Sequence, residues 1–344
     1  MQSKKIRILT FHSAYSYGAV LQTYALYKFL CKYYTDVKVV DFRPQYFTLE
    51  CIWNRPKTWI LCFQFRFRRT KIDYTKVISA EELRQTPPDA DVYVIGSDQV
   101  WNPSITKSVQ DIYFGDFIPN NRKKISYAAS FGRTIFSKDE VNKIKSLIHD
   151  FSAISVREKS AVSFCMQSLD LQAECVLDPT FLLNDYVHLF HASKIKKELG
   201  VFVLNNNSNE VFEVSGRIAG LMHLKPKVIN KAKPIKGFKT IAFPSIPRFL
   251  KEIYNSTFIV TNSFHGLAFS VIFNKQFAFV STNPANVTRA VNILEQLNLT
   301  NRLFNSYHDL LESKIWNVDI DYKIVNDRLA ELKQQSIHFL LSNI

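Results

Sequence analysis

Short apolar runs alternate along this chain with polar turns and with stretches whose apolar residues recur at helical spacing. The first run, Ile6–Phe11, has the pattern of a buried strand, and the stretch Ala19–Tyr33 has the pattern of a helix. A second strand pattern, Val37–Phe42, follows directly. A strand, a helix and a strand in this order predict two parallel strands joined by a helical crossover.

The same alternation continues through the rest of the sequence and predicts an α/β fold. Further strands are predicted at Asp91–Ile95, Ile125–Ala129, Ala153–Val156, Cys175–Asp178, Gly200–Leu204, Lys227–Asn230, Phe258–Val260 and Phe277–Val280. Further helices are predicted at Ser137–His149, where Ser137 and Glu140 form a capping box, and at Glu210–Met222, Pro247–Asn255, Leu267–Phe273, Arg289–Leu297 and Asp321–Leu341. The stretch Lys225–Lys239 carries six Lys and two Pro, which favours an exposed basic loop region.

A chain of 344 residues exceeds the size that one hydrophobic core usually serves, so two domains are expected. The composition changes after Phe190, where the Lys-rich stretch 191–199 is a candidate hinge. We therefore predict an N-terminal domain over 1–190, a second domain over 191–320 and a C-terminal helix over 321–344. Two βαβ halves are typical of a two-lobed enzyme with its site in the cleft.

The composition places the chain among globular proteins of a reducing compartment. Hydrophobic residues make up 47% and charged residues 22%, and the low Gly count, 9, argues against disorder. The 5 Cys are scattered, without a CxxC pair or a His at metal-ligand spacing, so neither a disulfide framework nor a metal site is expected. No signal peptide and no membrane-spanning window is indicated, so we expect a cytoplasmic protein that is soluble or membrane-peripheral.

The net charge of +14 favours anionic partners, which include phosphorylated substrates, anionic membranes and nucleic acid. One segment, Cys51–Lys71, mixes Trp and Phe with Arg and Lys and contains no acidic residue. This composition is typical of a contact with an anionic membrane surface. A helix that packs its aromatic side chains inward explains it as well, and single-stranded nucleic acid is a weaker alternative.

The stretch Phe258–Val280 places candidate chemistry at a turn from a strand into a helix. After the strand, the polar step Thr261–Ser263 offers helix caps, and Gly266 leaves room for a close backbone approach. His265 is then expected at the carboxyl edge of a sheet, where open α/β sheets bind ligands. From the residues alone, a structural and a functional histidine are equally favoured.

Two further turns could hold a ligand. The turn before the helix at Ala19 contains Gly18, which indicates either an anion site at a helix N-terminus or an ordinary connection. Because no G-x-G-x-x-G is present, dinucleotide binding is only weakly supported. The polar stretch Gly96–Pro103 follows a strand and is typical of a ligand-binding loop at a sheet edge.

Six segments in the same order resemble one family over roughly Ile6–Arg302. They are YSYGAVLQTYAL, VIGSDQVWNP, SYAASFG, SVREKSA, VLDPTFLL and TNSFHGLAFSVIFNK. Together they resemble the polysaccharide pyruvyl transferase family. The resemblance implies a GT-B-like fold with two Rossmann-like domains facing a cleft. It also implies transfer of pyruvate from phosphoenolpyruvate onto two hydroxyls of a sugar, which gives a cyclic ketal and releases phosphate. Family members act on surface-polysaccharide precursors that are often lipid-linked.

The resemblance assigns the family's catalytic His to His265, as a general acid. Phosphoenolpyruvate must gain a proton at its methylene carbon before C2 becomes electrophilic, and an imidazolium can donate one near neutral pH. The anionic donor also needs fixed cations. By resemblance, Arg157, Arg289 and Arg302 match basic positions of the family.

Some members carry an Arg two residues before this His, where the present chain has Ser263. The charge of the donor would then be met by Arg289 or Lys275. In the first domain, the resemblance implies that Tyr17, Gly18, Asp98 and Gln99 face the cleft on the acceptor side. Asp98 could act as a base for a sugar hydroxyl or only order its loop.

We therefore expect a cytoplasmic pyruvyl transferase of cell-surface glycan synthesis, working at the inner face of a membrane without a metal or a bound cofactor. One alternative is a GT-B glycosyltransferase that uses a nucleotide sugar, because one fold serves many functions. Another is a non-catalytic, membrane-peripheral partner in glycan assembly. Nucleic-acid binding is supported by the net charge alone and is not expected.

Overall fold

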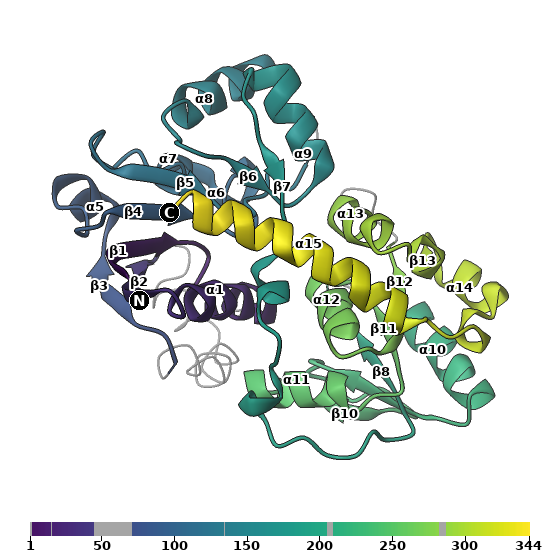
Figure 1. Ribbon diagram of the computed structural model, residues 1–344. Coiled ribbons are helices and arrows are strands. Elements are labelled where there is room, and N and C mark those ends of the chain that lie inside the picture. The colour runs from purple at the N-terminus through teal and green to yellow at the C-terminus, as the bar shows by residue number, and fades with distance from the viewer. Residues whose placement is uncertain (1, 15, 45–70, 134, 205–208, 282–286) are drawn as a thin grey trace. The chain divides into compact units, whose positions relative to one another are not determined.

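The computed structural model describes residues 2–14, 16–44, 71–133, 135–204, 209–281 and 287–344. The chain divides into two compact units (Figure 1). Among the described residues, unit 1 contains those up to Leu183 together with Ala330–Ile344, and unit 2 contains Asn184–Leu329. The first unit therefore ends at Leu183 rather than at residue 190, and the C-terminal helix is divided between the units. Of the aromatic and basic segment Cys51–Lys71, all but Lys71 lies outside the described residues.

Unit 1 is built on a five-stranded sheet in which every pairing is parallel. The strand order is β3-β2-β1-β4-β5, with bounds β1 (Gln2–Leu9), β2 (Tyr34–Phe42), β3 (Tyr74–Ile78), β4 (Val92–Ile95) and β5 (Lys123–Ser126). Ile8 of β1 lies level with Val39 of β2 and Val94 of β4, so the carboxyl ends of these strands meet at one edge. A two-stranded parallel sheet pairs β6 (Ser155–Val156) with β7 (Glu174–Cys175).

The helices of unit 1 follow its strands. Their bounds are α1 (Tyr17–Leu30), α5 (Ala80–Gln85), α6 (Pro103–Thr106), η2 (Lys107–Val109), α7 (Gln110–Tyr113), α8 (Lys138–Ile148), α9 (Lys159–Phe164), η3 (Cys165–Leu169) and η4 (Pro179–Leu182). Every residue of α1 except Lys28 is buried, so this helix belongs to the core rather than to the surface. Trp101 is fully buried and stacks on Phe114, with 5.2 Å between the ring centroids.

Unit 1 is completed by residues from the far end of the sequence. The backbone N–H of Leu177 donates to the Ser336 hydroxyl over 2.9 Å, and the Lys4 ammonium donates to the backbone carbonyl of Ile344 over 2.7 Å. Both residues, 336 and 344, belong to the part of the chain that follows unit 2. Unit 1 is therefore discontinuous in sequence.

Unit 2 is built on a six-stranded parallel sheet with the order β10-β9-β8-β11-β12-β13. Its strands are β8 (Glu198–Phe202), β9 (Lys225–Ile229), β10 (Lys239–Ile241), β11 (Phe258–Thr261), β12 (Gln276–Val280) and β13 (Leu303–Phe304). Its helices are η5 (Val187–Leu189), α10 (Glu210–Leu221), α11 (Ile246–Tyr254), α12 (Phe264–Ile272), α13 (Thr288–Gln296), η7 (Thr300–Arg302), α14 (Tyr307–Ser313), η8 (Ile315–Asn317) and the first part of α15 (Tyr322–Ser342), the long yellow helix in Figure 1.

The parallel order of both sheets confirms the predicted α/β class. The capping box at Ser137 is also confirmed, because its hydroxyl and the Glu140 carboxylate each accept a backbone N–H of the other residue. The sequence analysis missed the short elements β3, α5, β10 and β13. These elements have few residues, and β3 and β10 are partly exposed, so they carry little of the apolar periodicity on which the predictions rest.

The expectation of an exposed basic loop over Lys225–Lys239 was wrong in one important respect. Lys227 lies in β9, which confirms the strand predicted at Lys227–Asn230, but its side chain is fully buried rather than exposed. Its ammonium donates to Glu198 and to Glu252, each over 2.9 Å. A buried ammonium needs such partners because burial of an unpaired charge is very costly.

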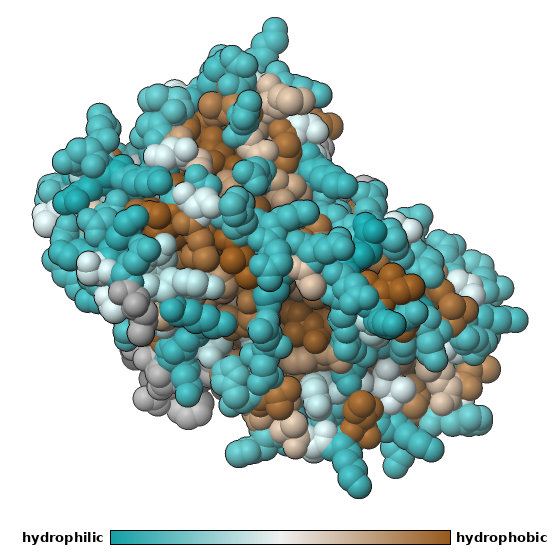
Figure 2. Space-filling view, viewed as in Figure 1, coloured by the Kyte–Doolittle hydropathy of each residue, from teal (hydrophilic) through white to brown (hydrophobic). Residues whose placement is uncertain are grey.

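The surface in Figure 2 is mostly hydrophilic, with separate apolar patches between the polar side chains. Large apolar side chains that are well exposed include Ile135, Met166, Ile195, Leu221 and Ile324. Within the described ranges, no helix combines the length and the apolar character needed to cross a bilayer.

We predict that Lys227→Met lowers the free energy of unfolding by about 3 to 5 kcal/mol, because it leaves two partly buried carboxylates without their cation. The matched control is Lys225→Met in the same strand, where the side chain is exposed and a small effect is expected. Urea unfolding of both variants provides the comparison. Equal shifts of the two midpoints would show that the buried ion cluster contributes no specific stability.

Candidate functional site

His265 follows the carboxyl end of β11, at the second position of α12. Ser263 caps this helix, because its hydroxyl accepts the backbone N–H of Gly266 over 3.4 Å. The Thr261 hydroxyl accepts the backbone N–H of Ser263 and donates to the carbonyl of Phe202 in the neighbouring strand. The polar step therefore ties the helix start to two strands and fixes the backbone beside His265.

Gly266 permits this tight junction between strand and helix. A Cβ at this position would lie 2.3 Å from the Thr261 hydroxyl and 3.0 Å from the Phe202 ring. Real Cβ atoms do not approach other atoms so closely, so any other residue would push α12 away from the sheet. The glycine thus lets the helix begin directly against the end of β11.

The groups around the start of α12 can bind an anion. The His265 side chain is largely buried, with its ring edge-to-face against Phe264 at 5.1 Å between centroids. The Arg289 guanidinium, from α13, lies 5.9 Å from the same Phe264 ring. His265 thus lies at a helix N-terminus, and both its ring and the Arg289 guanidinium lie beside the Phe264 ring. A helix N-terminus and a cation in this region favour a bound carboxylate or phosphate.

A further contact orders this edge and was missed in the sequence analysis. The Asn262 amide accepts the backbone N–H of Leu204 over 2.7 Å and donates to the Leu204 carbonyl over 3.0 Å. It thereby holds the segment that follows β8 beside the end of β11. The polar step in the sequence contained this residue, but only the fold shows which strand end it contacts.

The structure places Lys275 at the opposite edge of the sheet. Lys275 directly precedes β12, so it lies at the amino end of a strand that runs parallel to β11. Its ammonium lies 4.9 Å from the Tyr254 ring centroid, and burial together with the nearby Lys227 lowers the pKa of Lys275 to about 8. The whole length of α12 separates it from His265, so it does not contribute to a donor site there.

Arg302, the third candidate cation of unit 2, has a structural environment. It is almost fully buried, and its guanidinium donates to the backbone carbonyls of Ile315 and Val318. Burial lowers the pKa of Arg302 from its ordinary value. These contacts anchor the turn around η8, so the donor role expected for Arg302 has no support in its local geometry.

In unit 1, Arg157 lies at the centre of a buried group of carboxylates. Its guanidinium is 2.7 Å from Asp178, 3.5 Å from Glu158 and 3.6 Å from Asp98. Burial alone would lower the pKa of Arg157, but the attraction of these carboxylates outweighs it and raises the pKa above the ordinary value. One cation facing three carboxylates is a poor site for an anion, so we do not assign Arg157 to donor binding.

The loop after β4 is built around Asp98 and Gln99. Asp98 has a φ of 73°, and its carboxylate accepts the backbone N–H of Gln99 over 2.9 Å. The Gln99 side chain accepts from the Asn102 amide over 2.8 Å. Gly132 packs against this pair, since a Cβ there would lie 2.1 Å from the Gln99 carbonyl oxygen. Asp98 thus orders its loop and also lies beside Arg157, and the geometry does not by itself assign it a catalytic role.

Tyr17 and Gly18 open α1 at the same edge of the unit 1 sheet. Ser16 caps the helix through the backbone N–H of Ala19, and both Tyr17 and Gly18 are buried. Burial raises the pKa of the Tyr17 phenol well above its ordinary value. The phenol is therefore neutral at physiological pH.

A second polar cluster at this edge was also missed. His12 follows β1, and its Nε2 donates to Asp41 at the end of β2 over 2.8 Å. Arg43 donates to the same carboxylate over 2.7 and 2.5 Å. Burial opposes ionisation of Asp41, but the hydrogen bonds from His12 and Arg43 outweigh it and hold the pKa of Asp41 well below its ordinary value. His12 directly follows the strand predicted at Ile6–Phe11, and Asp41 lies near the end of the strand predicted at Val37–Phe42. These positions at two strand ends were the available signal.

The comparison with known families is decisive for this chain. Residues 17–284, most of its length, match the family described as polysaccharide pyruvyl transferase. The chain belongs to the polysaccharide pyruvyl transferase family. This confirms the resemblance inferred from the six sequence segments. No curated protein matches the chain.

Solved structures show the fold of this family member. HepE from Anabaena, in complex with UDP and glucose, aligns with a TM-score of 0.61 and 11% identity, covering 99% of this chain and 100% of that one. A UDP-N-acetylglucosamine 2-epimerase from Rickettsia bellii aligns with a TM-score of 0.54 and 12% identity, covering 99% and 97%. S. aureus MnaA, in a structure with UDP, aligns with a TM-score of 0.54 and 13% identity, covering 100% of this chain and 98% of that one. At these identities the similarity shows the fold alone, and it confirms the expected GT-B type with a C-terminal helix.

We predict that Asp41→Asn lowers the free energy of unfolding at pH 7 by about 2 kcal/mol, because charge-assisted hydrogen bonds to His12 and Arg43 are lost. The folded-state pKa lies below the ordinary value of 3.8, so this stabilisation is present above that value and disappears as the pH falls toward the folded-state pKa. The difference between the two proteins should therefore shrink in acid.

Urea unfolding at pH 7 and pH 3 measures this difference. Asp89→Asn is the control, because Asp89 forms an exposed ion pair with Lys5 and should cost little at either pH. A stability difference for Asp41→Asn that is equal at both pH values would contradict the assigned pKa direction.

Proposed function

We propose that this protein transfers pyruvate from phosphoenolpyruvate onto two hydroxyls of a sugar in a cell-surface polysaccharide precursor. Family membership makes the chain a transferase of polysaccharide pyruvylation. The choice of donor is supported by one arrangement in unit 2, in which His265, at the N-terminus of α12, and Arg289 both lie beside the Phe264 ring. A donor that carries both a carboxylate and a phosphate suits such a site.

The proposed reaction begins with a proton transfer from His265 to the methylene carbon of the donor, which becomes a methyl group. C2 is then electrophilic, and a sugar hydroxyl oxygen forms a bond to it. The bond between C2 and the phosphate oxygen breaks, and the second hydroxyl closes the ketal ring. Of the two hydroxyl protons released, one is taken by Asp98, the proposed base, and leaves with phosphate, and the other restores the imidazolium. Burial of His265 helps to keep water from C2.

Arg289 is the proposed anchor for the donor anion. Ser263 occupies the position of an Arg found in some family members, and here its hydroxyl caps α12. Lys275, the other candidate replacement, lies at the opposite edge of the sheet. Arg289 already contacts the Phe264 ring next to His265, so it is the cation that the local geometry favours.

Unit 1 is proposed to recognise the acceptor through the Tyr17–Gly18 turn and the Asp98–Gln99 loop. The buried groups near this loop carry more carboxylates than cations, which suits a sugar better than an anionic donor. We propose Asp98 as the base for an acceptor hydroxyl. From the sequence alone, we also propose that the acceptor is lipid-linked and that the protein works in the cytoplasm at the inner face of a membrane. The segment 51–71 is proposed to contact that membrane.

We predict that His265→Ala lowers kcat for pyruvyl transfer by about 10²- to 10⁴-fold, because general acid catalysis contributes on that scale. Mass spectrometry of a panel of sugar acceptors, with phosphate release followed in parallel, measures the reaction. The control is His308→Ala, which removes an exposed histidine of the same unit. Turnover that survives in a folded His265→Ala protein would remove the acid role.

We predict that Arg289→Gln raises the KM for phosphoenolpyruvate by about ten-fold or more with a smaller change in kcat, because it removes a charge-assisted contact made with the bound donor. Arg217→Gln, an exposed substitution in α10, is the charge-matched control. An unchanged KM for Arg289→Gln would place donor binding elsewhere. Thermal stabilisation by UDP but not by phosphoenolpyruvate would favour a nucleotide-sugar donor instead.

A further inference from the structure

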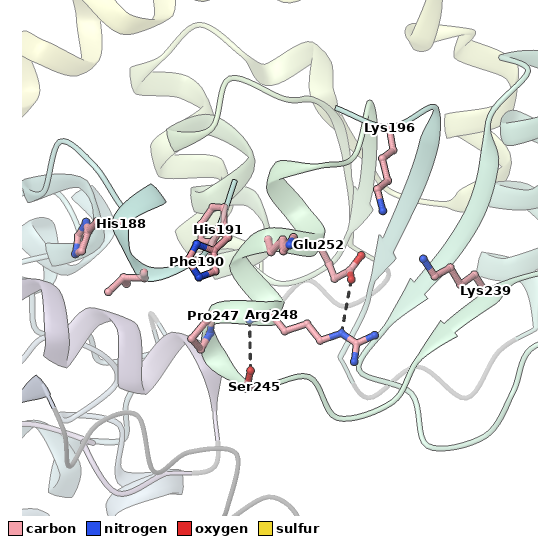
Figure 3. Close-up of a pocket in the computed structure, with 11 residues that line it drawn as sticks. His188, Phe190, His191, Lys196, Lys239, Ser245, Pro247, Arg248 and Glu252 are labelled. Carbon is pink, nitrogen blue, oxygen red and sulfur yellow. Dashed lines mark hydrogen bonds and ion pairs between the residues drawn. The ribbon is translucent and has the colours of Figure 1, made fainter. Parts of the chain in front are cut away.

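Unit 2 contains a pocket of about 600 Å³ whose lining is strongly basic (Figure 3). Lys196, Lys239, Arg248 and Lys251 contribute cationic side chains to it. Glu252 is the only carboxylate among the lining residues, which all belong to the described part of the chain. The volume falls within the range of about 300 to 1,000 Å³ that is typical of small-molecule sites.

This pocket is separate from the His265 site. Lys196 precedes the start of β8, and Lys239 is the first residue of β10. His265, in contrast, follows the end of β11. Because these strands are parallel, the amino ends of β8 and β10 and the carboxyl end of β11 lie at opposite edges of the sheet.

The carboxylates near the pocket are already engaged by a buried cation. Lys227 takes one oxygen of Glu198 and one of Glu252, each at 2.9 Å. The remaining oxygens lie 3.7 Å from Lys239 and from Arg248, respectively. These two contacts are longer than hydrogen bonds, and the side chains of Lys239 and Arg248 are 54% and 57% exposed. Both cations can therefore turn toward a ligand.

The cluster carries a surplus of positive charge. Burial opposes ionisation of Glu198, but attraction from Lys227, Lys239 and Lys196 outweighs it and holds the pKa of Glu198 below its ordinary value. With Arg248 and Lys251 included, five cationic side chains face two carboxylates. This surplus of positive charge favours an anionic ligand.

The cationic side chains converge on one place. In Figure 3 the side chains of Lys196, which precedes β8, of Lys239 in β10 and of Arg248 in α11 extend toward the region around Glu252. Phe190 and Pro247 also line the pocket, but the figure draws them apart from these charged ends. The charged part of the pocket therefore suits a small anionic group.

We propose that this pocket binds a phosphate ester, with the phosphate held by Arg248, Lys239 and Lys196. A phosphate dianion neutralises more of the surplus than a carboxylate does, and the Arg guanidinium matches its oxygens in a bidentate manner. The same chemistry occurs in soluble organophosphates and in phospholipid headgroups. The inference does not depend on pyruvyl transfer.

The test uses glycerol phosphate in isothermal titration calorimetry and, in parallel, phosphatidylcholine vesicles with and without phosphatidic acid in a flotation assay. The pocket variant is Lys239→Gln/Arg248→Gln, which leaves the buried Lys227 contacts in place. The matched control is Lys233→Gln/Lys236→Gln, which removes the same charge from exposed residues that do not line the pocket. Arg289→Gln serves as a control for binding at the proposed donor site.

We expect the pocket variant to bind at least about ten-fold more weakly, and both controls to bind as the wild type does. Binding of glycerol phosphate would identify a soluble ligand, whereas binding of phosphatidic acid vesicles alone would identify a lipid headgroup. Equal weakening by the two double variants would show attraction by net charge only and would overturn the proposal. Loss in Arg289→Gln but not in the pocket variant, or no binding by the wild type, would overturn it as well.

Discussion

The junction between β11 and α12 depends on the absence of a side chain at residue 266. There the Thr261 hydroxyl occupies the space that a Cβ would need, and that hydroxyl holds the neighbouring strand through Phe202. Because the helix begins directly against the sheet, its N-terminal dipole and the His265 imidazole lie at the end of β11, and Arg289 of α13 lies beside the neighbouring Phe264 ring. The chemistry proposed for unit 2 follows from this one steric constraint.

Both units contain clusters of paired charges at an edge of their sheet. In unit 1, Arg157 is surrounded by carboxylates, and Asp41 is held by His12 and Arg43. In unit 2, the edge at His265 is cationic, and the amino ends of the strands carry a second, larger cationic cluster around Lys227. These cationic sites contribute to the net charge of +14, which favours anionic partners.

Local patterns in the sequence were sufficient for the strand and helix order, for the cap at Ser137 and for the turn at His265, because each depends on residues close in sequence. They were insufficient wherever a partner comes from far along the chain. The burial of Lys227 was missed, although a strand was predicted there, because its partners Glu198 and Glu252 are 29 and 25 positions away. Lys275 looked close to His265, but a helix carries it to the other edge of the sheet. The sequence identified Arg157 as a motif residue, but it did not show that three carboxylates surround its guanidinium.

The discontinuity of unit 1 has a consequence for the synthesis of this protein. A ribosome releases the strands β1 to β5 first, but the residues that supply Ser336 and the carbonyl of Ile344 emerge only after all of unit 2. Unit 1 therefore cannot complete its fold until these residues are synthesised, and part of its surface stays uncovered until then. Unit 2 is nearly contiguous in sequence and can complete its fold earlier. Partly folded chains with exposed apolar surface aggregate readily. Although most of unit 1 is synthesised first, it is the unit that stays incomplete for longer and is therefore the more exposed to aggregation.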